Sequence, residues 1–226
     1  MDQASPDPAL LEESLNDLAW MNRYLGVTAG IVHQLGRLLD GRAPERLRVL
    51  DVGAGGGDIL AALAGRWERR RLAFEGVGLD LGVVASRIAV ERLGARKGDN
   101  KIGMVCGDAR ALPFPDRSFD VVVSSTFLHH LEPRDGILVL REMARVSALG
   151  VIVTDLCRGP AGYMAAWTLA NTLWRRHRYP RHDAPTSARA AYTMAEARVL
   201  AERAGLAAAI EPQRWFRWAL RWRRPE

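Results

Sequence analysis

Cysteine and long apolar runs are scarce in this sequence, and each shortage excludes a class of protein. Only two of the 226 residues are cysteines, Cys106 and Cys157, so a disulfide scaffold and a four-cysteine zinc site are excluded and no metal site is indicated. No uncharged apolar run reaches the roughly 18 residues of a membrane span. Residues 1–6 lack the basic and apolar parts of a secretion signal, so a cytoplasmic location is expected.

Lysine is also almost absent, although the chain is basic. Lys97 and Lys101 stand beside 30 arginines, the formal net charge is +6, and residues 158–226 hold 13 arginines against five acids. A basic C-terminal region is typical of proteins that bind nucleic acid or anionic membranes. The excess of arginine over lysine indicates a coding bias instead, so a nucleic-acid partner is disfavoured and contact with a membrane surface stays open.

The composition that remains is sufficient for one folded domain preceded by helices. Hydrophobic residues make up 48% of the chain and charged residues 26%. In residues 1–44, Asp7 is a candidate helix cap and Pro8 suits the first helical position. Apolar residues then recur at helical spacing, with a break at Gly26. We expect two helices here, acting as a cap or lid on a domain formed by residues 45–226.

From residue 47 onward, strand patterns and helix patterns alternate. Short β-branched runs separated by helices predict βαβ units and an α/β fold with a mainly parallel sheet that is buried on both faces. The predicted strands cover residues 47–52, 76–80, 101–107, 119–124 and 151–156, and the predicted helices cover 59–70, 83–93, 134–146 and 193–204.

Two further segments follow the parallel strands. Residues 159–174 carry no charge and place Tyr163, Trp167, Ala170 and Trp174 on one helical face. We interpret this segment as a buried or lid helix; a wall for an apolar substrate and a membrane-surface contact are the alternatives. Residues 216–223 alternate apolar and polar positions, which predicts a strand. Together with residues 206–210, and a break at Glu211–Pro212, it would form a C-terminal antiparallel hairpin.

The segment from Asp51 to Asp58 is the most informative motif. A strand, a run of glycines and a helix form the layout of a nucleotide-binding turn. The dinucleotide pattern fails, because Asp58 and Leu60 stand where small residues are needed. A phosphate-binding P-loop fails as well, because no lysine is nearby.

Carboxylates surround this turn at the predicted carboxyl edge of the sheet. Asp51 and Asp58 bracket it, Asp80 ends the next strand and Asp108 follows the third. Four carboxylates would repel a pyrophosphate but suit a ligand with cationic groups and a ribose. S-adenosylmethionine carries a sulfonium, an ammonium and a ribose diol, and no phosphate. Its carboxylate could use the amides of the glycine loop.

Four motifs in order within residues 45–157 resemble those of class I S-adenosylmethionine-dependent methyltransferases. They are Asp51-x-Gly53-x-Gly55-x-Gly57, Gly78-Leu79-Asp80, Cys106-Gly107-Asp108-Ala109 with Leu112-Pro113-Phe114, and Phe119-Asp120-Val121-Val122 with Leu128-His129-His130-Leu131. The resemblance implies a Rossmann-like sheet of seven strands, the last antiparallel. It also implies cofactor contacts from Asp51, Gly53, Ala54, Gly55, Gly57, Asp80 (ribose), Leu81, Asp108 and Ala109 (adenine), and Ser124. Asp120 has a structural interpretation, at the start of a strand.

Histidines are the candidates for the chemical step. His129 and His130 follow the fourth strand, at the edge where α/β proteins bind ligands. One of them could instead be structural, bonded to backbone or to Glu132. His182 beside Asp183 is a rival base, in a predicted loop from Tyr179 to Pro185. Removal of the proton of a phenol, with a pKa of about 10, costs such a base about 4 kcal/mol near neutral pH. Removal of the proton of a water-like alcohol costs about 12 kcal/mol. A phenol, an enol or an activated ring carbon is therefore the favoured acceptor, with O-methylation preferred over C-methylation.

The insert of residues 158–192 resembles that of small-molecule methyltransferases of quinone and aromatic polyketide pathways, through Arg181–Pro185 and Ala191–Thr193. Such an insert, with the N-terminal helices, would enclose an apolar aromatic acceptor. Two alternatives stay open. One is a nucleic-acid (RNA) methyltransferase, although residues 124–127 lack the Asn/Asp-Pro-Pro-aromatic motif of amino-adenine enzymes. The other is a non-catalytic, cofactor-binding partner protein. The sequence does not indicate an oligomeric state.

Overall fold

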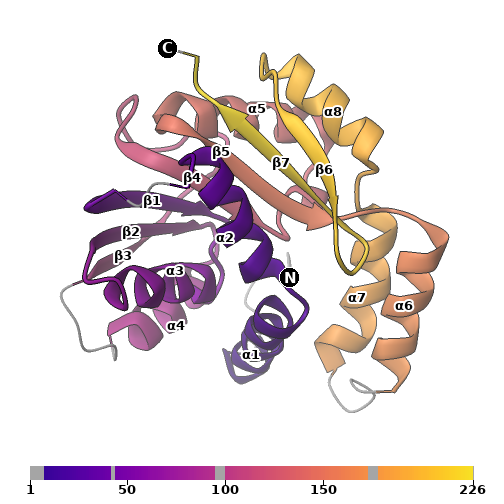
Figure 1. The fold of residues 1–226 in the computed structure, drawn as a ribbon. Helices are drawn as coiled ribbons and strands as arrows, with labels where there is room; N and C mark the ends of the chain where they lie inside the picture. The colour runs from indigo at the N-terminus through magenta and orange to yellow at the C-terminus, as the bar shows by residue number, and fades with distance from the viewer. Residues whose placement is uncertain (1–7, 42–43, 95–99, 173–177, 226) are drawn as a thin grey trace.

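The protein is an α/β fold built on one seven-stranded sheet, as the computed structural model of residues 8–41, 44–94, 100–172 and 178–225 shows (Figure 1). The strand order is β3-β2-β1-β4-β5-β7-β6; β1 to β5 pair in parallel and β7 pairs antiparallel with both neighbours. The predicted Rossmann-like sheet with a C-terminal antiparallel hairpin is therefore confirmed. The strands are β1 Arg46–Val52, β2 Ala73–Asp80, β3 Lys101–Cys106, β4 Phe119–Ser125, β5 Ser147–Leu156, β6 Ala209–Gln213 and β7 Arg217–Arg223.

Helices cover both faces of the sheet. In β4, Val121 and Val123 pack with the helices α2 and α3, whereas Val122 packs with α5 and α8 on the other face. Successive strand residues point to opposite faces, so this unbroken apolar run requires cover on both sides. None of the helices in the described ranges is both long enough and apolar enough to cross a bilayer. The helices are α1 Pro8–Tyr24, α2 Val27–Leu38, α3 Asp58–Glu68, α4 Val83–Gly94, α5 Pro133–Val146, α6 Pro160–Asn171, α7 Arg178–Ala190 and α8 Met194–Arg203.

The two predicted N-terminal helices are present, and α1 begins at Pro8 as expected; Asp7 lies outside the described residues. The apolar face of α1 is divided between two tasks. Leu11 and Leu15 pack against Ala85 of α4, whereas Leu18 and Met21 line a cavity that is described below. Helix α1 therefore bridges the body of the domain and that cavity.

The prediction of a loop from Tyr179 to Pro185 is wrong, because helix α7 spans Arg178–Ala190. Pro185 stands inside this helix, where a proline removes one hydrogen bond and costs about 3 kcal/mol. Helix α7 lies beside α6 (Figure 1). Packing between the two helices offsets this local cost. The position of a proline in the sequence does not reveal such packing.

The helix expected in residues 159–174 is present, but its aromatic face is not the face that lines the cavity. Helix α6 is present, and Ala170 is buried, but Trp167 is 48% exposed; Trp174 lies outside the described residues. The face of α6 that lines the cavity carries small side chains, among them Gly162, Ala165 and Ala166. Small residues on this face leave volume for a ligand between the helices.

The C-terminal hairpin is shifted from the expected register. Residues 209–213 pair with β7 and the turn lies at residues 214–216, so the expected break at Glu211–Pro212 is instead part of β6. Proline is tolerated there because β6 is the edge strand, where one side of the backbone needs no ladder partner.

The arginines of β7 and the residues after it bind within the fold. Arg221 donates to Gln34 Oε1 at 2.6 Å, and Arg224 Nε donates to the carbonyl of Ser147 at 3.1 Å. Trp218 and Trp222, which alternate with them, are 0% and 6% exposed. This strand therefore offers neither exposed stacking rings nor a uniform cationic face.

Candidate active site

The glycine loop after β1 has the backbone conformation that its sequence requires. Gly53, Gly55 and Gly57 have φ values of 74°, 50° and 73°, in the left-handed region that favours glycine. A Cβ on Gly53 would lie 2.5 Å from the ring of Phe127. The amides of Gly53 and Ala54 donate to the carbonyl of Leu79, which ties the loop to the end of β2. The loop is therefore tied to β2, and a side chain at Gly53 would clash with Phe127.

Asp51 and Asp58 form a buried acidic centre beneath this loop. Asp51 is 2% exposed, and its Oδ2 atom has no hydrogen-bond partner among the described residues. Burial raises the pKa of Asp51 well above its usual value, and the charges of Asp58 and Asp80 raise it further. Burial also raises the pKa of Asp58, against a hydrogen bond from Asn22 Nδ2 at 3.0 Å. A cationic ligand group would relieve this repulsion and satisfy the unpaired oxygen.

Asp80 and Leu81 lie at the end of β2, beside the glycine loop. Asp80 accepts hydrogen bonds from the amide of Gly55 at 2.9 Å and from that of Gly82 at 2.8 Å. Its carboxylate is thereby held next to the loop. Leu81, a predicted cofactor contact, is 72% exposed.

Asp108 follows β3 at the same edge and is paired within the chain. Arg110 donates to it at 2.7 Å and also bonds Asp135 at 3.1 Å. The hydrogen bonds from Arg110 lower the pKa of Asp108, which keeps it ionised. Ala109, next in the chain, is 8% exposed.

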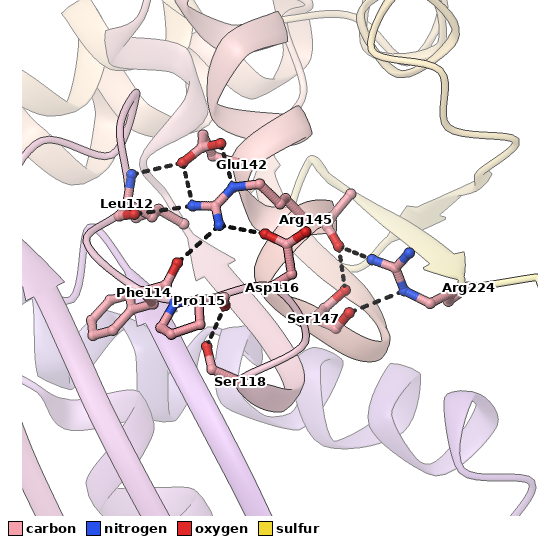
Figure 2. A network of polar contacts seen from close by, with 10 residues as sticks. Leu112, Phe114, Pro115, Asp116, Ser118, Glu142, Arg145, Ser147 and Arg224 are labelled. Atoms are coloured by element: carbon pink, nitrogen blue, oxygen red, sulfur yellow. Dashed lines mark hydrogen bonds and ion pairs between the residues drawn. The ribbon is translucent and has the colours of Figure 1, made fainter.

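Arg145 of α5 holds the segment that continues from Asp108 (Figure 2). Its guanidinium donates to the carbonyls of Leu112 and Phe114 at 3.0 and 2.9 Å and to Asp116 at 2.8 Å. Glu142 accepts from Arg145 and from the amide of Leu112 at 2.8 Å. These contacts fix a segment without regular secondary structure, which bears two of the predicted cofactor contacts near its start.

Ser124 and Asp120 both lie within β4 and serve the sheet. The Ser124 hydroxyl, in a residue 1% exposed, donates to the carbonyl of Val52 at 2.8 Å. Asp120 accepts from the amide of Arg48 at 2.7 Å, at the opposite end of the strand. The hydroxyl of Ser124 thus joins β4 to β1, while Asp120 has the expected structural role.

His129 is paired with a carboxylate that the sequence analysis did not select. Its Nδ1 atom lies 2.7 Å from Oδ1 of Asp155, and its amide donates to Oδ2 at 3.0 Å. Both side chains are at most 1% exposed. Burial raises the pKa of Asp155, but the charge and hydrogen bonds of His129 and the amide of Leu156 outweigh it, so the pKa is lowered. Asp155 is an ionised acceptor that orients the imidazole ring.

The other two candidate histidines have different settings. The ring centroid of His130 lies 4.1 Å from that of His129, and His130 lines the cavity described below. His182 belongs to α7, but its side chain lies outside the described residues. Glu132, considered above as a histidine partner, is the N-cap residue of α5.

A cavity of about 560 Å³ opens beside the His129–Asp155 pair. Helices α1, α6 and α7, the segment after β4 and the turn between β6 and β7 all contribute to its wall. Leu18, Met21 and Leu169 make much of the wall apolar. Polar groups come from Thr126 and Arg217, and two carboxylates, those of Asp17 and Asp183, also line the cavity. Phe127, between Thr126 and His129, contacts Gly53, so this segment lies between the cavity and the glycine loop. The geometry places an apolar ligand site next to a cofactor-type loop.

The sequence analysis missed Asp155, Thr126 and Arg217. Asp155 had a signal of the kind used for Asp51 and Asp80, because it follows an apolar run at the carboxyl end of a predicted strand. Arg217 had none, since alternation in a terminal strand does not reveal which arginine is buried.

Comparisons with known proteins all find similarity to methyltransferases. Residues 49–150 match the family described as a methyltransferase domain. An uncharacterized methyltransferase from Mycolicibacterium gilvum (strain PYR-GCK) is 31% identical over 203 residues, covering 85% of this chain and 75% of that relative. The demethylmenaquinone methyltransferase of Roseiflexus castenholzii (strain DSM 13941 / HLO8) is 36% identical over 113 residues, covering 50% of this chain and 43% of the relative. A SAM-dependent methyltransferase structure from Aquifex aeolicus, 16% identical, has the same fold, with a TM-score of 0.65 over 97% of this chain and 99% of that one.

The strand order, the glycine loop and the acidic edge define a class I cofactor-binding architecture. The chain belongs to the S-adenosylmethionine-dependent methyltransferase family. Its buried, unpaired Asp51 oxygen and the left-handed glycines fit that cofactor, which carries two cationic groups and no phosphate. The chain spans less than half of the length of the demethylmenaquinone methyltransferase that it matches.

Proposed function

We propose that this chain transfers the methyl group of S-adenosylmethionine to an acidic hydroxyl, phenolic or enolic, of a small apolar acceptor that occupies the cavity. The observation that carries the proposal is the His129–Asp155 pair at the wall of a largely apolar cavity next to the glycine loop. When bound, the cofactor supplies an activated methyl group on a sulfonium. The chain therefore has to orient the acceptor, exclude water and take up one proton.

His129 is the base in this proposal. Asp155 occupies Nδ1, and Nε2 has no hydrogen-bond partner among the described residues, so Nε2 is the nitrogen left to accept the hydroxyl proton. The ionised Asp155 stabilises the imidazolium that forms. One histidine can remove the proton of a phenol near neutral pH at a cost of about 4 kcal/mol, which favours O-methylation of an acidic hydroxyl.

The walls of the cavity support a small acceptor rather than a nucleic acid. Helices α1, α6 and α7 would act as a lid that separates the acceptor from water. The two aromatic residues of β7 are buried and its arginines bind within the fold, so this strand does not support base stacking. Trp215 and Phe216, in the turn before it, are exposed and line the cavity. The relative named for demethylmenaquinone also supports a small-molecule acceptor.

The test is methyl transfer from labelled S-adenosylmethionine to a panel of naphthols, hydroxyquinones and phenols, with products identified by mass spectrometry and NMR. His129→Gln should lower turnover at least hundredfold with unchanged affinity for S-adenosylhomocysteine. His33→Gln is the matched control, because His33 is an exposed histidine of α2. A full rate in His129→Gln would refute the base. Cofactor binding without turnover on any acceptor would favour the non-catalytic alternative, and a C-methylated product would refute O-methylation.

A further inference from the structure

Arg217 is a buried cation on the wall of the cavity. It is the first residue of β7, is 6% exposed and lines the cavity together with His129. Its Nη1 atom donates to Thr126 Oγ1 at 3.2 Å, whereas its Nε atom is buried with no hydrogen-bond partner among the described residues. A guanidinium presents five N–H donors in a planar fork, so most of its capacity is left for a ligand.

The charge of Arg217 is not neutralised by a contact within the described part of the chain. No carboxylate there lies within 4.0 Å of it. The negative charge of Asp155 acts on Arg217, but Asp155 already accepts from His129 Nδ1 and from the amides of His129 and Leu156. Farther along the same strand, Arg221 and Arg223 each have a carboxylate partner. Arg217 therefore differs from its strand neighbours in lacking one.

Thr126 holds Arg217 at a cost in backbone strain. Its φ is 53°, a left-handed conformation that a β-branched residue adopts at a cost of about 1–2 kcal/mol. Its amide is fixed by the carbonyl of Thr154 at 2.9 Å. Thr126, whose hydroxyl accepts from Arg217, lines the wall of the cavity together with His129.

We propose that Arg217 binds an anionic oxygen of the acceptor, so that the acceptor carries a carboxylate or an ionised enol beside the hydroxyl that His129 deprotonates. The substrate class is therefore an apolar, ring-containing acid. A buried arginine pairs in a bidentate manner with a carboxylate, or with the enolate oxygen and the neighbouring carbonyl oxygen of a hydroxyquinone, which would fill its unpaired Nε position. This inference deepens the proposed function and rests on it for the role of His129.

The experiment measures equilibrium binding of four probes to the protein saturated with S-adenosylhomocysteine, by calorimetry. The probes are 1-hydroxy-2-naphthoate, 2-naphthoate, 2-hydroxy-1,4-naphthoquinone as an acidic enol, and 1-naphthol as the neutral member. The wild-type protein should bind at least one of the three anions tenfold or more tightly than 1-naphthol. Preference for the carboxylates or for the enol distinguishes the two sources of the anion. Equal or weaker binding of all three anions would overturn the proposal.

Variants separate recognition from a structural role. Arg217→Gln should reduce the preference to less than twofold with affinity for 1-naphthol unchanged, and Arg217→Lys should retain part of it. Arg221→Gln, four residues farther along β7 and bonded to Gln34, should keep the full preference. Loss of affinity for anionic and neutral probes alike in Arg217→Gln would show a structural role and overturn the proposal. If the Arg217 variants do not fold, the comparison of probes on the wild-type protein decides.

These measurements involve no methyl transfer, so the proposed anion site can be refuted independently of the proposed activity. An anion preference without turnover would leave the binding site standing and remove the proposed reaction. Turnover of neutral phenols without an anion preference would do the reverse.

Discussion

His129 Nδ1 lies 2.7 Å from Oδ1 of Asp155, and the two side chains are buried where β4 and β5 end side by side. The carboxylate also accepts the amide protons of His129 and Leu156, so its position is set by the backbone. A carboxylate held in this way allows only the ring orientation in which Nδ1–H points toward it. The geometry of the pair is thus set by contacts within the chain.

Asp155→Asn should lower turnover by a factor of about 10²–10⁴, because an amide can donate to Nδ1 and stabilise the wrong tautomer. The affinity for S-adenosylhomocysteine should stay within twofold of wild type, as Asp155 lies on the acceptor side. Steady-state kinetics and calorimetry check the two expectations. A variant with wild-type turnover would show that His129 needs no orienting carboxylate.

The same carboxylate should affect acid stability. The pKa of Asp155 is lowered in the folded protein, so it contributes stability above the unfolded value of about 3.9, and this contribution is lost as pH falls through the folded pKa. Between pH 6 and 3, the free energy of unfolding should therefore fall less steeply in Asp155→Asn than in wild type. Denaturation curves at several pH values measure this difference. Parallel curves for the two proteins would contradict the direction of the shift.

Asp51→Asn should stabilise the ligand-free protein at neutral pH while weakening cofactor binding. Because the pKa of Asp51 is raised in the folded state, the folded protein binds more protons than the unfolded chain, and stability falls as pH rises from about 4 toward the folded pKa. The amide removes this penalty but also removes the anion. Thermal melts from pH 4 to 8 and a titration with S-adenosylhomocysteine check both effects.

A second measurement reports on the proton itself. Where Asp51 is protonated in the ligand-free protein, a cationic ligand should release a proton on binding. The binding enthalpy of wild type should then depend on the ionisation enthalpy of the buffer, and that of Asp51→Asn should not. Identical buffer dependence in the two proteins would rule out Asp51 as the group that titrates.

Arg145→Gln should loosen the segment between β3 and β4 and cost about 2 kcal/mol, because several hydrogen bonds to a charged group are lost. The melting temperature should fall by about 4–8 °C, and cofactor affinity should fall with it. Arg141→Gln, on the same helix with one bond to the carbonyl of Arg203, is the control and should change the melting temperature little. Equal shifts in both variants would contradict a specific role for Arg145.

Gly53→Ala should abolish cofactor binding or folding. The added methyl group meets the ring of Phe127 at 2.5 Å, and the left-handed φ of 74° costs a further 1–2 kcal/mol or so. Gly36→Ala is the control: it lies in α2 with no atom within 4 Å, and alanine there should stabilise the protein by about 0.5–1 kcal/mol. Normal cofactor affinity in Gly53→Ala would show that the loop adapts.

The patterns that succeeded in the sequence were short and local. Val121–Val123 predicted a strand buried on both faces, and the glycines from Gly53 to Gly57 predicted a turn between a strand and a helix; both are present. The patterns that failed were overruled by packing. Pro185 lies inside α7 and Pro212 inside β6, because helix pairing and an edge position tolerate what a proline breaks locally.

Most of the strands and helices and the glycine loop could be read from the chain, because periodicity and turn chemistry act over a few residues. The His129–Asp155 pair and the buried cation could not. His129 and Asp155 are 26 residues apart and Thr126 and Arg217 are 91 apart, and they meet because β4, β5 and β7 pair in one particular register. Such long-range contacts depend on how long chain segments close and on which side chains become buried. Both are properties of the folded molecule as a whole.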